Sequence, residues 1–436
     1  MALTGRTALI AALGALVVGL LPGWHGVLAV GLPLLAAVLY DLARAAPVRT
    51  LRFARDGDTS ARLGETAEVR LTVTNPDGRR PLRAELRDAW PPSSWQPGTA
   101  FAAARHRLTV PPRERRRLVT TLRPTRRGDH RAVRVTVRSH GPLGLAARQG
   151  GHEVPWTVRV LPPFTSRRHL PAKLARLREL DGRTSVLTRG EGTEFDSLRD
   201  YVPGDDVRSI DWRATARRSA VAVRTWRPER DRHLLLVLDT GRTSAGRVGD
   251  VPRLDAAMDA ALLLTALAHR AGDRVDLLAF DREVRASVRG RTGSDVLPAT
   301  VAALAALEPR LVETDTSALA ATALAQAPRQ SLLVLFTGLE AAPVEAGLLP
   351  VLPRLTERHT VLVAAVGDPR VAELEAGRST VSAVYEAASA AHHRAERQLT
   401  AQRLRGLGVT VVEATPSNLA PALADAYLTL KATGRL

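Results

Sequence analysis

The sequence predicts an α/β protein with a doubly wound sheet, preceded by a small all-β sandwich and an N-terminal transmembrane helical hairpin. Three observations predict this order. Two apolar runs lie near the N-terminus, short stretches of alternating apolar and polar residues follow, and from His233 onward continuous apolar runs alternate with helical stretches. Such alternation is typical of a mostly parallel sheet covered on both faces. The predicted segments are a hairpin at 1–45, a sandwich at 46–163, a connector at 164–232 and an α/β domain at 233–436.

Charge and composition exclude several kinds of site. The 436-residue chain is long enough for two or three domains and carries 62 Lys and Arg against 44 Asp and Glu, a net charge of +18. The basic residues are almost all Arg and are spread along the chain without an aromatic-interleaved patch, so we do not expect nucleic-acid binding. The chain contains no Cys, which excludes disulfides, thiol catalysis and zinc–thiolate sites.

The two apolar runs, 7–21 and 24–40, are separated by Pro22-Gly23. Each is slightly shorter than the roughly 20 residues that usually span a bilayer. A secretory signal peptide is the alternative for the first run, but a second run directly after it favours a hairpin. Arg residues flank the hairpin and are absent from its turn, so the positive-inside rule predicts a multi-pass protein of the cell membrane with a cytoplasmic soluble part. The arginines expected to face an anionic membrane surface are Arg44, Arg49, Arg52 and Arg55.

The segment after the hairpin has the pattern of short strands. Val69, Leu71 and Val73 alternate with polar residues, 75–78 has turn residues, and 118–122 and 133–137 repeat the alternation. Short strands at this spacing predict a small sandwich of immunoglobulin-like type. We interpret it as a spacer without a ligand.

The α/β domain is predicted from its buried strands. Continuous apolar runs, typical of strands buried on both faces, occur at 234–238, 275–280, 332–336, 361–366 and 409–412. Helical stretches are expected at 254–268, 295–307, 317–325, 380–404 and 419–430. Ligands of such sheets sit at the carboxyl ends of the strands, where Asp239 and Thr337 are found.

Residues 190–217, which we call the signature segment, differ in chemistry from the rest of the chain. Seven of these 28 residues are acidic, and they alternate with arginines and a few large apolar residues. Pro203-Gly204 predicts a turn, and Asp205 or Asp206 suits the N-cap of a short helix after it. So many charges and aromatic residues in one short stretch indicate a specialised segment.

The signature segment resembles that of the domain-of-unknown-function 58 family. The matching residues are Gly190, Glu194, Phe195, Leu198, Arg199, Tyr201, Pro203, Gly204, Asp205, Asp206, Arg208, Ile210, Asp211, Trp212, Ala214, Thr215 and Arg217. The resemblance extends to Arg127-Gly128 and 142–145, although Gly141 stands where the family usually has Asp. It implies a membrane-anchored chain with a von Willebrand factor type A-like (Rossmann-like) domain. It also implies work beside a MoxR-type AAA+ ATPase, in protein assembly or maturation at the cell envelope.

The type A fold carries a metal-ion-dependent adhesion site in its active versions, with hydroxyl and carboxylate ligands that suit Mg²⁺. Asp239, Thr243 and Thr314 match that pattern, with Thr316 as an alternative to Thr314. Gly241 and Gly338 stand where two oxygen ligands would be. We therefore expect no metal cofactor and interpret Asp239 as capping its loop. A metal-dependent ligand-binding module stays open as an alternative function.

No nucleotide-binding or hydrolase motif is present, so we expect a non-enzymatic interaction protein. The signature carboxylates Asp205, Asp206 and Asp211 leave an unrecognised hydrolase open as a further alternative. We expect the signature segment to pack against the α/β domain through its apolar residues and to present its charges to a protein partner. Those apolar residues are Phe195, Leu198, Ile210 and Trp212.

Overall fold

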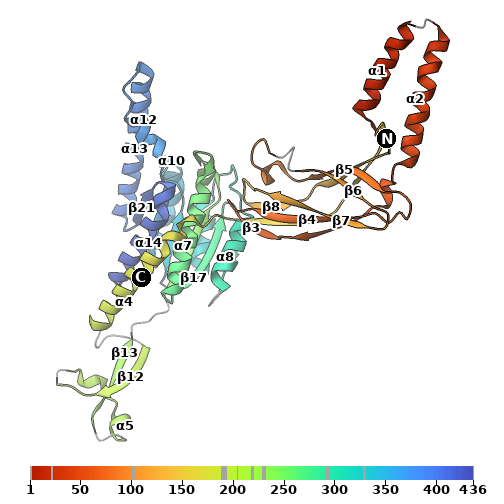
Figure 1. Ribbon diagram of the computed structural model, residues 1–436. Helices are drawn as coiled ribbons and strands as arrows, with labels where there is room; N and C mark the ends of the chain where they lie inside the picture. Colours follow the sequence, from red (N-terminus) through yellow and green to blue (C-terminus); the bar gives the residue numbers. More distant parts are fainter. Residues whose placement is uncertain are drawn as a thin grey trace. The chain divides into compact units, whose positions relative to one another are not determined.

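A computed structural model of the chain describes residues 2–20, 23–99, 104–187, 194–203, 205–217, 220–227, 232–290, 295–327 and 330–435. The chain divides into two compact units, Met1–Leu161 and Pro162–Leu436. The first carries an apolar helical hairpin and β sheets, and the second a mixed α/β fold with a largely parallel sheet (Figure 1).

The first unit begins with two helices that lie side by side, α1 (Gly5–Leu20) and α2 (Trp24–Arg44). Their large apolar side chains are mostly exposed. The helices approach closely where Gly14 meets Val30, since a Cβ at residue 14 would overlap the Val30 side chain. Within the described residues, 24–50 contains the one helix that is long and apolar enough to cross a membrane, a test that a signal sequence also passes. The multi-pass topology therefore stays a prediction.

The end of α2 is joined to the β sheets by Asp41, which is fully buried. Its carboxylate accepts backbone N–H groups from Leu143 at 2.8 Å, Leu145 at 2.7 Å and Ala146 at 2.8 Å. A side chain at Gly141 would overlap this carboxylate. Position 141 therefore requires Gly, because Asp41 occupies the space that a side chain there would need.

Three sheets follow the hairpin, with strand orders β1-β10-β9-β5-β6, β2-β4-β7 and β3-β11-β8. The strands are β1 (Ala2–Leu3), β2 (Arg52–Gly57), β3 (Ser60–Arg62), β4 (Ala67–Thr74), β5 (Leu82–Ala89), β6 (Arg105–Val110), β7 (Arg115–Leu122), β8 (Gly128–Arg131), β9 (Arg134–His140), β10 (Ala146–His152) and β11 (Thr157–Leu161). The short 3-10 turns are η1 (Val48–Thr50) and η2 (Pro92–Ser94). The predicted strands at 69–73 and 118–122 lie inside β4 and β7, and 133–137 overlaps β9. Period-2 alternation located them because each strand buries one face.

One of the arginines expected at a membrane surface is inside this unit. The Arg55 side chain is 1% exposed and forms an ion pair with the buried carboxylate of Asp88. Arg55 also donates to the carbonyl of Val154 at 2.9 Å. The expectation for Arg55 is therefore wrong, whereas Arg44, Arg49 and Arg52 are exposed. Sequence position alone does not reveal that β2 turns this side chain towards β5.

The second unit is built on a six-stranded sheet of order β18-β17-β14-β19-β20-β21, in which the edge strand β18 is antiparallel and the others are parallel. Its strands are β14 (His233–Asp239), β17 (Arg274–Phe280), β18 (Val284–Val288), β19 (Leu332–Phe336), β20 (Thr360–Val366) and β21 (Thr410–Ala414). The five predicted strands are confirmed. The missed strand, β18, is half-exposed and lacks a continuous apolar run.

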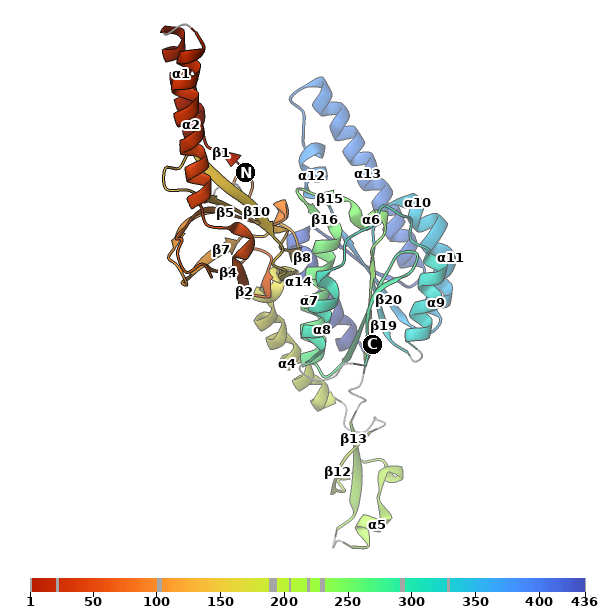
Figure 2. The same cartoon turned by 90° about the vertical axis from the view of Figure 1, so that its right-hand side faces the viewer.

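Helices cover both faces of this sheet (Figure 2). The longer ones are α4 (Leu170–Leu187), α7 (Arg253–Arg270), α8 (Val296–Ala305), α9 (Thr316–Gln326), α11 (Leu349–Thr356), α13 (Val381–Gly406) and α14 (Pro416–Ala432). The shorter pieces are η3 (Thr165–His169), α6 (Arg242–Ala245), α10 (Ala341–Pro343), the π-helical turn η6 (Val344–Leu348), α12 (Pro369–Glu375) and the two-residue strands β15 (Arg247–Val248) and β16 (Val251–Pro252). Helices α9, α11 and α13 share one apolar cluster with alternate residues of the strands. Helices α7 and α14 pack together, and the five helices predicted in this domain are confirmed.

Candidate functional site

The signature segment contributes strand β12 (Glu194–Asp200), which pairs in antiparallel orientation with β13 (Ala222–Arg227), just after the segment. Between them lie a 3-10 turn, η4 (Val207–Ser209), and a one-turn helix, α5 (Trp212–Thr215). The backbone of Asp211 donates to the carbonyl of Ala222 at 2.8 Å, which ties this connection to β13. Strand β12 was not predicted from the sequence, because its alternating charges hid the strand. Gly190 and Gly204 lie outside the described residues, as do the side chains of Glu194 and Phe195.

The predicted turn around Pro203 is present. The backbone N–H of Asp205 donates to the carbonyl of Val202 at 3.0 Å, and the Asp205 carboxylate accepts the N–H of Val202 at 2.9 Å. Arg199 binds the same carboxylate through two nitrogen atoms at 2.7 and 2.5 Å. This hydrogen bonding raises the pKa of Arg199 above its usual value. Asp205 thus holds the turn and anchors it to β12.

The other two carboxylates cap short helices. Asp206 accepts the backbone N–H of Arg208 at 2.9 Å, which confirms the predicted N-cap. Asp211 caps α5 through the N–H groups of residues 213 and 214, both at 3.0 Å, and binds Arg224 Nε at 2.8 Å. The bond from the Ala214 N–H, followed by that from Arg224, lowers the pKa of Asp211. Thr215 accepts the N–H of Ala222 at 3.0 Å. These carboxylates hold the backbone of the signature segment in place.

Several large apolar side chains of the signature segment are exposed, contrary to our expectation. Trp212 is 66% exposed, and Leu198 and Ile210 are only half-buried. The small interior is made instead by Ala222 and Val223 of β13, which are fully buried. The exposed large apolar residues are Tyr201, Val202, Val207, Trp212 and Val221. Around them Arg208 and Arg217 are exposed and Ala214 is half-buried. Trp212, Val207 and Val202 are therefore more accessible than the carboxylates of Asp205 and Asp211.

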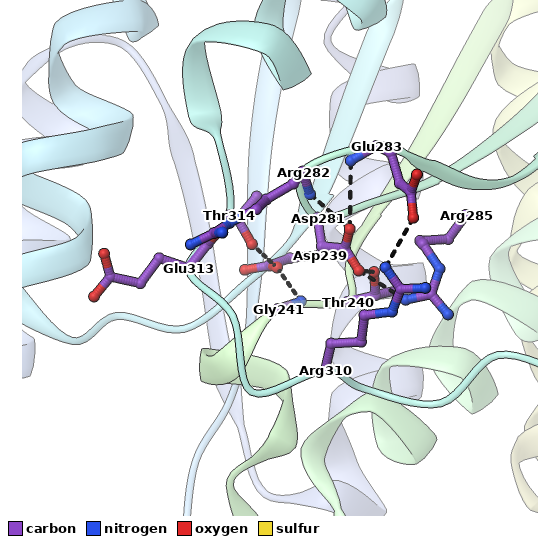
Figure 3. A network of polar contacts seen from close by, with 10 residues as sticks. All are labelled: Asp239, Thr240, Gly241, Asp281, Arg282, Glu283, Arg285, Arg310, Glu313 and Thr314. Atoms are coloured by element: carbon purple, nitrogen blue, oxygen red, sulfur yellow. Dashed lines mark hydrogen bonds and ion pairs between the residues drawn. The ribbon is translucent and has the colours of Figure 1, made fainter.

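A second candidate site lies at the carboxyl ends of β14 and β19, centred on Asp239 (Figure 3). One carboxylate oxygen, Oδ1, accepts the N–H of Gly241 at 2.8 Å and the hydroxyl of Thr314 at 2.5 Å. The other, Oδ2, accepts the hydroxyls of Thr243 at 2.7 Å and Thr337 at 2.8 Å. The structure brings together the three predicted residues of this site. It adds Thr337, whose place at the end of a buried strand was the signal for it.

The two glycines at ligand positions each leave room for another side chain. A Cβ at Gly241 would overlap the hydroxyl of Thr314 and lie 2.8 Å from the carbonyl of Val312. A Cβ at Gly338 would overlap the carboxylate of Glu340. The oxygens that fill these spaces are already engaged, since Thr314 donates to Asp239 and Glu340 is paired with arginines.

Glu340 belongs to a separate ion-pair cluster. Its carboxylate pairs with Arg253 of α7 and, at 3.1 Å, with Arg397 of α13. Arg397 in turn binds Glu413 of β21 at 2.8 Å. Burial by itself would raise the pKa of Glu340, but the two arginines outweigh burial and hold the pKa below its usual value. Glu340 therefore fixes the loop after β19 to two helices.

The residues present do not fit an adhesion-type Mg²⁺ site. Both oxygens of Asp239 accept two hydrogen bonds each, which uses the acceptor capacity of a carboxylate. Mg²⁺ requires near-octahedral oxygen coordination, and Gly241 and Gly338 supply no side-chain oxygen. Among the described residues no group of three or more His, Cys, Asp or Glu is placed to hold a metal ion.

A neighbouring carboxylate fixes the loops beside Asp239. Asp281 is fully buried; it accepts Thr240 Oγ1 at 3.2 Å and Arg285 Nη1 at 2.8 Å, as well as the N–H groups of residues 282 and 283 (Figure 3). Burial would raise the pKa of Asp281, but the hydrogen bond from Arg285 and those from the backbone outweigh it and lower the pKa. The backbone of Asp315 also donates to the carbonyl of Asp281 at 2.9 Å. This network holds the loop that carries Thr314 in place.

A cavity of about 450 Å³ opens beside Asp239. Its polar side is formed by Asp239 and the three threonines that donate to it, and Arg242, Glu313 and Asp315 add charged side chains. Leu319, Val344 and Leu348 contribute apolar lining. The cavity lies at the edge of the sheet where ligands of open α/β sheets bind.

Comparison with known proteins identifies bacterial relatives. Residues 197–405 match the family model described as "Protein of unknown function DUF58". The uncharacterized protein Rv1480 of Mycobacterium tuberculosis is 30% identical over 190 residues, which cover 43% of this chain and 59% of that protein. The uncharacterized protein YeaD of Bacillus subtilis is 29% identical over 113 residues, or 26% of this chain and 28% of YeaD. The chain thus spans about three-fifths of the length of the mycobacterial relatives it matches.

Among solved structures, the CARDB domain of the PF1109 protein from Pyrococcus furiosus matches 25% of this chain and 86% of its own. The sequence identity is 15% and the TM-score is 0.19. A similarity at this level supports no inference about this chain.

Proposed function

We propose, since residues 197–405 match the DUF58 family model, that the chain is a membrane-anchored, non-enzymatic interaction protein. In this proposal it binds a MoxR-type AAA+ ATPase and takes part in protein assembly or maturation at the cell envelope. Helices α1 and α2 span the cell membrane, and both units are cytoplasmic. The first unit acts as an immunoglobulin-like spacer, and the α/β unit has a von Willebrand factor type A-like fold.

The observation that carries the proposal is the exposure of large apolar side chains on the signature segment. Trp212, Val207 and Val202 are each more than half exposed within a segment that has few buried residues of its own. Contiguous exposed apolar side chains mark interaction sites, and Trp is enriched among the residues that dominate binding energy. Arg208 and Arg217 of the same segment are also exposed and suit a partner surface that carries acidic residues.

The roles of the carboxylates support a non-enzymatic function. Asp205, Asp206 and Asp211 each accept backbone N–H groups of their own turns and caps. Asp239 accepts four hydrogen bonds from its own unit. A general base needs an acceptor position directed at substrate, whereas Asp239 directs four acceptor positions at the protein, and Asp205 and Asp211 direct three each.

The membrane anchor is supported by the exposure of the hairpin. Large apolar residues are exposed along both helices, which is unfavourable in water and suits lipid contact. They are Leu9, Ile10, Leu13, Leu16, Val17 and Leu20 on α1, and Trp24, Val27, Leu28, Leu32, Leu35, Leu39 and Tyr40 on α2. The exposed arginines Arg44, Arg49 and Arg52 follow α2, as expected for the cytoplasmic side.

The test is a binding measurement between the full-length protein in detergent micelles and a purified MoxR-type ATPase of the same organism. Trp212→Ala should weaken binding by about tenfold or more, because central aromatic anchors contribute roughly 2 kcal/mol or more. Tyr385→Ala is the matched control, since Tyr385 on α13 is also an exposed aromatic residue. Equal affinity of wild type and Trp212→Ala would refute the proposed docking surface, and absence of binding by the wild type would refute the partner.

A further inference from the structure

We propose that the cavity beside Asp239 binds the ammonium group of a lysine side chain on a protein partner, without a metal ion. That the lysine belongs to a protein partner rests on the proposed function. The preference of the cavity for an ammonium group does not rest on it. A bound metal ion would attract an acidic ligand, whereas the ligand proposed here is a cation.

The hydroxyl groups around Asp239 are fixed as hydrogen-bond acceptors. A threonine hydroxyl has one proton, and a carboxylate can only accept. Thr243, Thr314 and Thr337 each direct that proton at Asp239, at 2.7, 2.5 and 2.8 Å. Their remaining lone pairs can therefore only accept from a ligand. All three threonines line the cavity, which thus presents three acceptors backed by a buried negative charge.

The charge of the cavity lining favours a cation. Asp239 is 7% exposed, and no Arg or Lys of the described residues forms an ion pair with it. Glu313 and Asp315 also line the cavity, and Arg242, the one basic residue among the described residues of the lining, pairs with Glu313 at 3.4 Å between Nη2 and Oε1. Four hydrogen bonds satisfy the oxygens of Asp239 but do not neutralise its charge, so a cation bound beside it would be stabilised by that charge. A carboxylate ligand would be repelled.

The shape of the cavity suits a lysine rather than a small ion. Leu319, Val344 and Leu348 form an apolar wall that an aliphatic stem can contact while the ammonium group reaches the hydroxyls. The volume of about 450 Å³ lies within the range of roughly 300–1,000 Å³ for ligand pockets. An ammonium group has three donors, which matches the three acceptors, whereas the planar guanidinium of Arg favours paired carboxylate oxygens.

A rare backbone conformation adjoins the same cavity. Val344–Leu348 forms a π-helical turn between α10 and α11, and Val344 and Leu348 line the cavity. Single π-helical turns are uncommon and occur frequently at functional sites. This observation is independent of the charge argument and points to the same place.

The experiment is a calorimetric titration of the full-length protein in detergent with N-acetyl-lysine methylamide, in excess EDTA. We expect saturable binding that the Nε-acetylated probe and the norleucine analogue do not show. Asp239→Asn should weaken it by about tenfold or more because the negative charge is lost. Asp259→Asn is the matched control, because Asp259 is a buried aspartate of the same unit that accepts the backbone N–H of Ser166 and does not line the cavity, so binding should be unchanged.

A second variant covers the case in which Asp239→Asn fails to fold. Thr337→Val keeps the shape of the side chain and removes one acceptor together with one of the four hydrogen bonds to Asp239, so binding should fall while the protein stays folded with a slightly lower melting temperature. Unchanged binding in a folded Thr337→Val or Asp239→Asn, equal binding of the acetylated probe, or binding that requires Mg²⁺ would each overturn the inference. If a free diamine bound more tightly than the peptide-like probe, the proposal that the ammonium group belongs to a protein would be overturned. Failure of the proposed function is read separately, from ATPase binding by Trp212 variants.

Discussion

The carboxylate of Asp41 at the end of α2 accepts the backbone N–H of Leu145 at 2.7 Å, although 104 residues separate the two in sequence. The hydroxyl of Thr4, just before α1, donates to the carbonyl of the same Leu145 at 3.1 Å. Both ends of the hairpin are thus bound to one loop of the β sheets. The hairpin and the sheets that follow it are held by polar contacts at a defined point.

Asp41→Ala should destabilise this connection. Three backbone N–H groups would lose their acceptor, and each buried unsatisfied group costs about 1–3 kcal/mol. We expect faster amide hydrogen exchange at residues 143, 145 and 146 and a lower melting temperature. Asp41→Asn keeps one acceptor oxygen and should show a smaller effect. Unchanged exchange at these amides in Asp41→Ala would show that the contacts contribute nothing.

In the signature segment, Asp205→Ala should cost more stability than Trp212→Ala. Asp205 accepts the Val202 N–H and two bonds from Arg199, and loss of a comparable capping group costs about 0.5–2 kcal/mol. Trp212 is mostly exposed, so its truncation should stay within about 0.5 kcal/mol. The size of the apolar side chain alone would suggest the opposite order, with the larger loss of stability for Trp212→Ala. Hydrogen exchange of residues 194–227 measures the loss of protection in each variant. A larger loss in Trp212→Ala than in Asp205→Ala would contradict the predicted order.

The strands of the α/β unit were predictable because burial on both faces demands continuous apolar runs, which are visible in the sequence. The helix–turn region 341–356 was missed because Pro343, Pro350 and Pro353 interrupt the helical pattern. The burial of Trp212 was wrongly expected because its environment depends on how a short segment pairs with itself. Asp239 was found from its strand end, but Thr314 and Thr337 lie 75 and 98 residues away, and only the fold brings their hydroxyls to it.

The Glu340 cluster should make stability depend on pH in the acidic range. The folded state lowers the pKa of Glu340 below its usual value of 4.5, so its ion pairs stabilise the fold fully above that value. The contribution is lost as pH falls through the lowered pKa. The difference in unfolding free energy between wild type and Glu340→Gln should therefore shrink as pH falls below 4.5 and through the lowered pKa of Glu340. Denaturant titrations at a series of pH values measure this, and a constant difference would contradict the ionised state of Glu340.

The proposed topology predicts that a C-terminal reporter is silent. Arginines follow α2 directly and are absent from the turn between α1 and α2, so both ends of the hairpin should face the cytoplasm. A phosphatase fused after Leu436, active only outside the membrane, should show no activity, and a fusion placed in the turn should be active. The opposite pattern would remove a cytoplasmic ATPase as partner.

Restoring the adhesion-site pattern at Gly241 should harm the fold instead of creating a metal site. A Cβ there would overlap the hydroxyl of Thr314 and lie 2.8 Å from the carbonyl of Val312, which belongs to the backbone and cannot move easily. Gly241→Ser should therefore destabilise the unit by about 1–3 kcal/mol, the usual cost of overpacking. Calorimetric titration with Mg²⁺ should show no micromolar binding for wild type or variant, since Gly338 still supplies no oxygen and Asp239 is already saturated with donors. The double variant Gly241→Ser with Thr314→Ala is the control, because removing the Thr314 side chain relieves the hydroxyl overlap and should recover part of the stability. A micromolar Mg²⁺ isotherm in the wild type, abolished by Asp239→Ala, would show that the site binds metal after all.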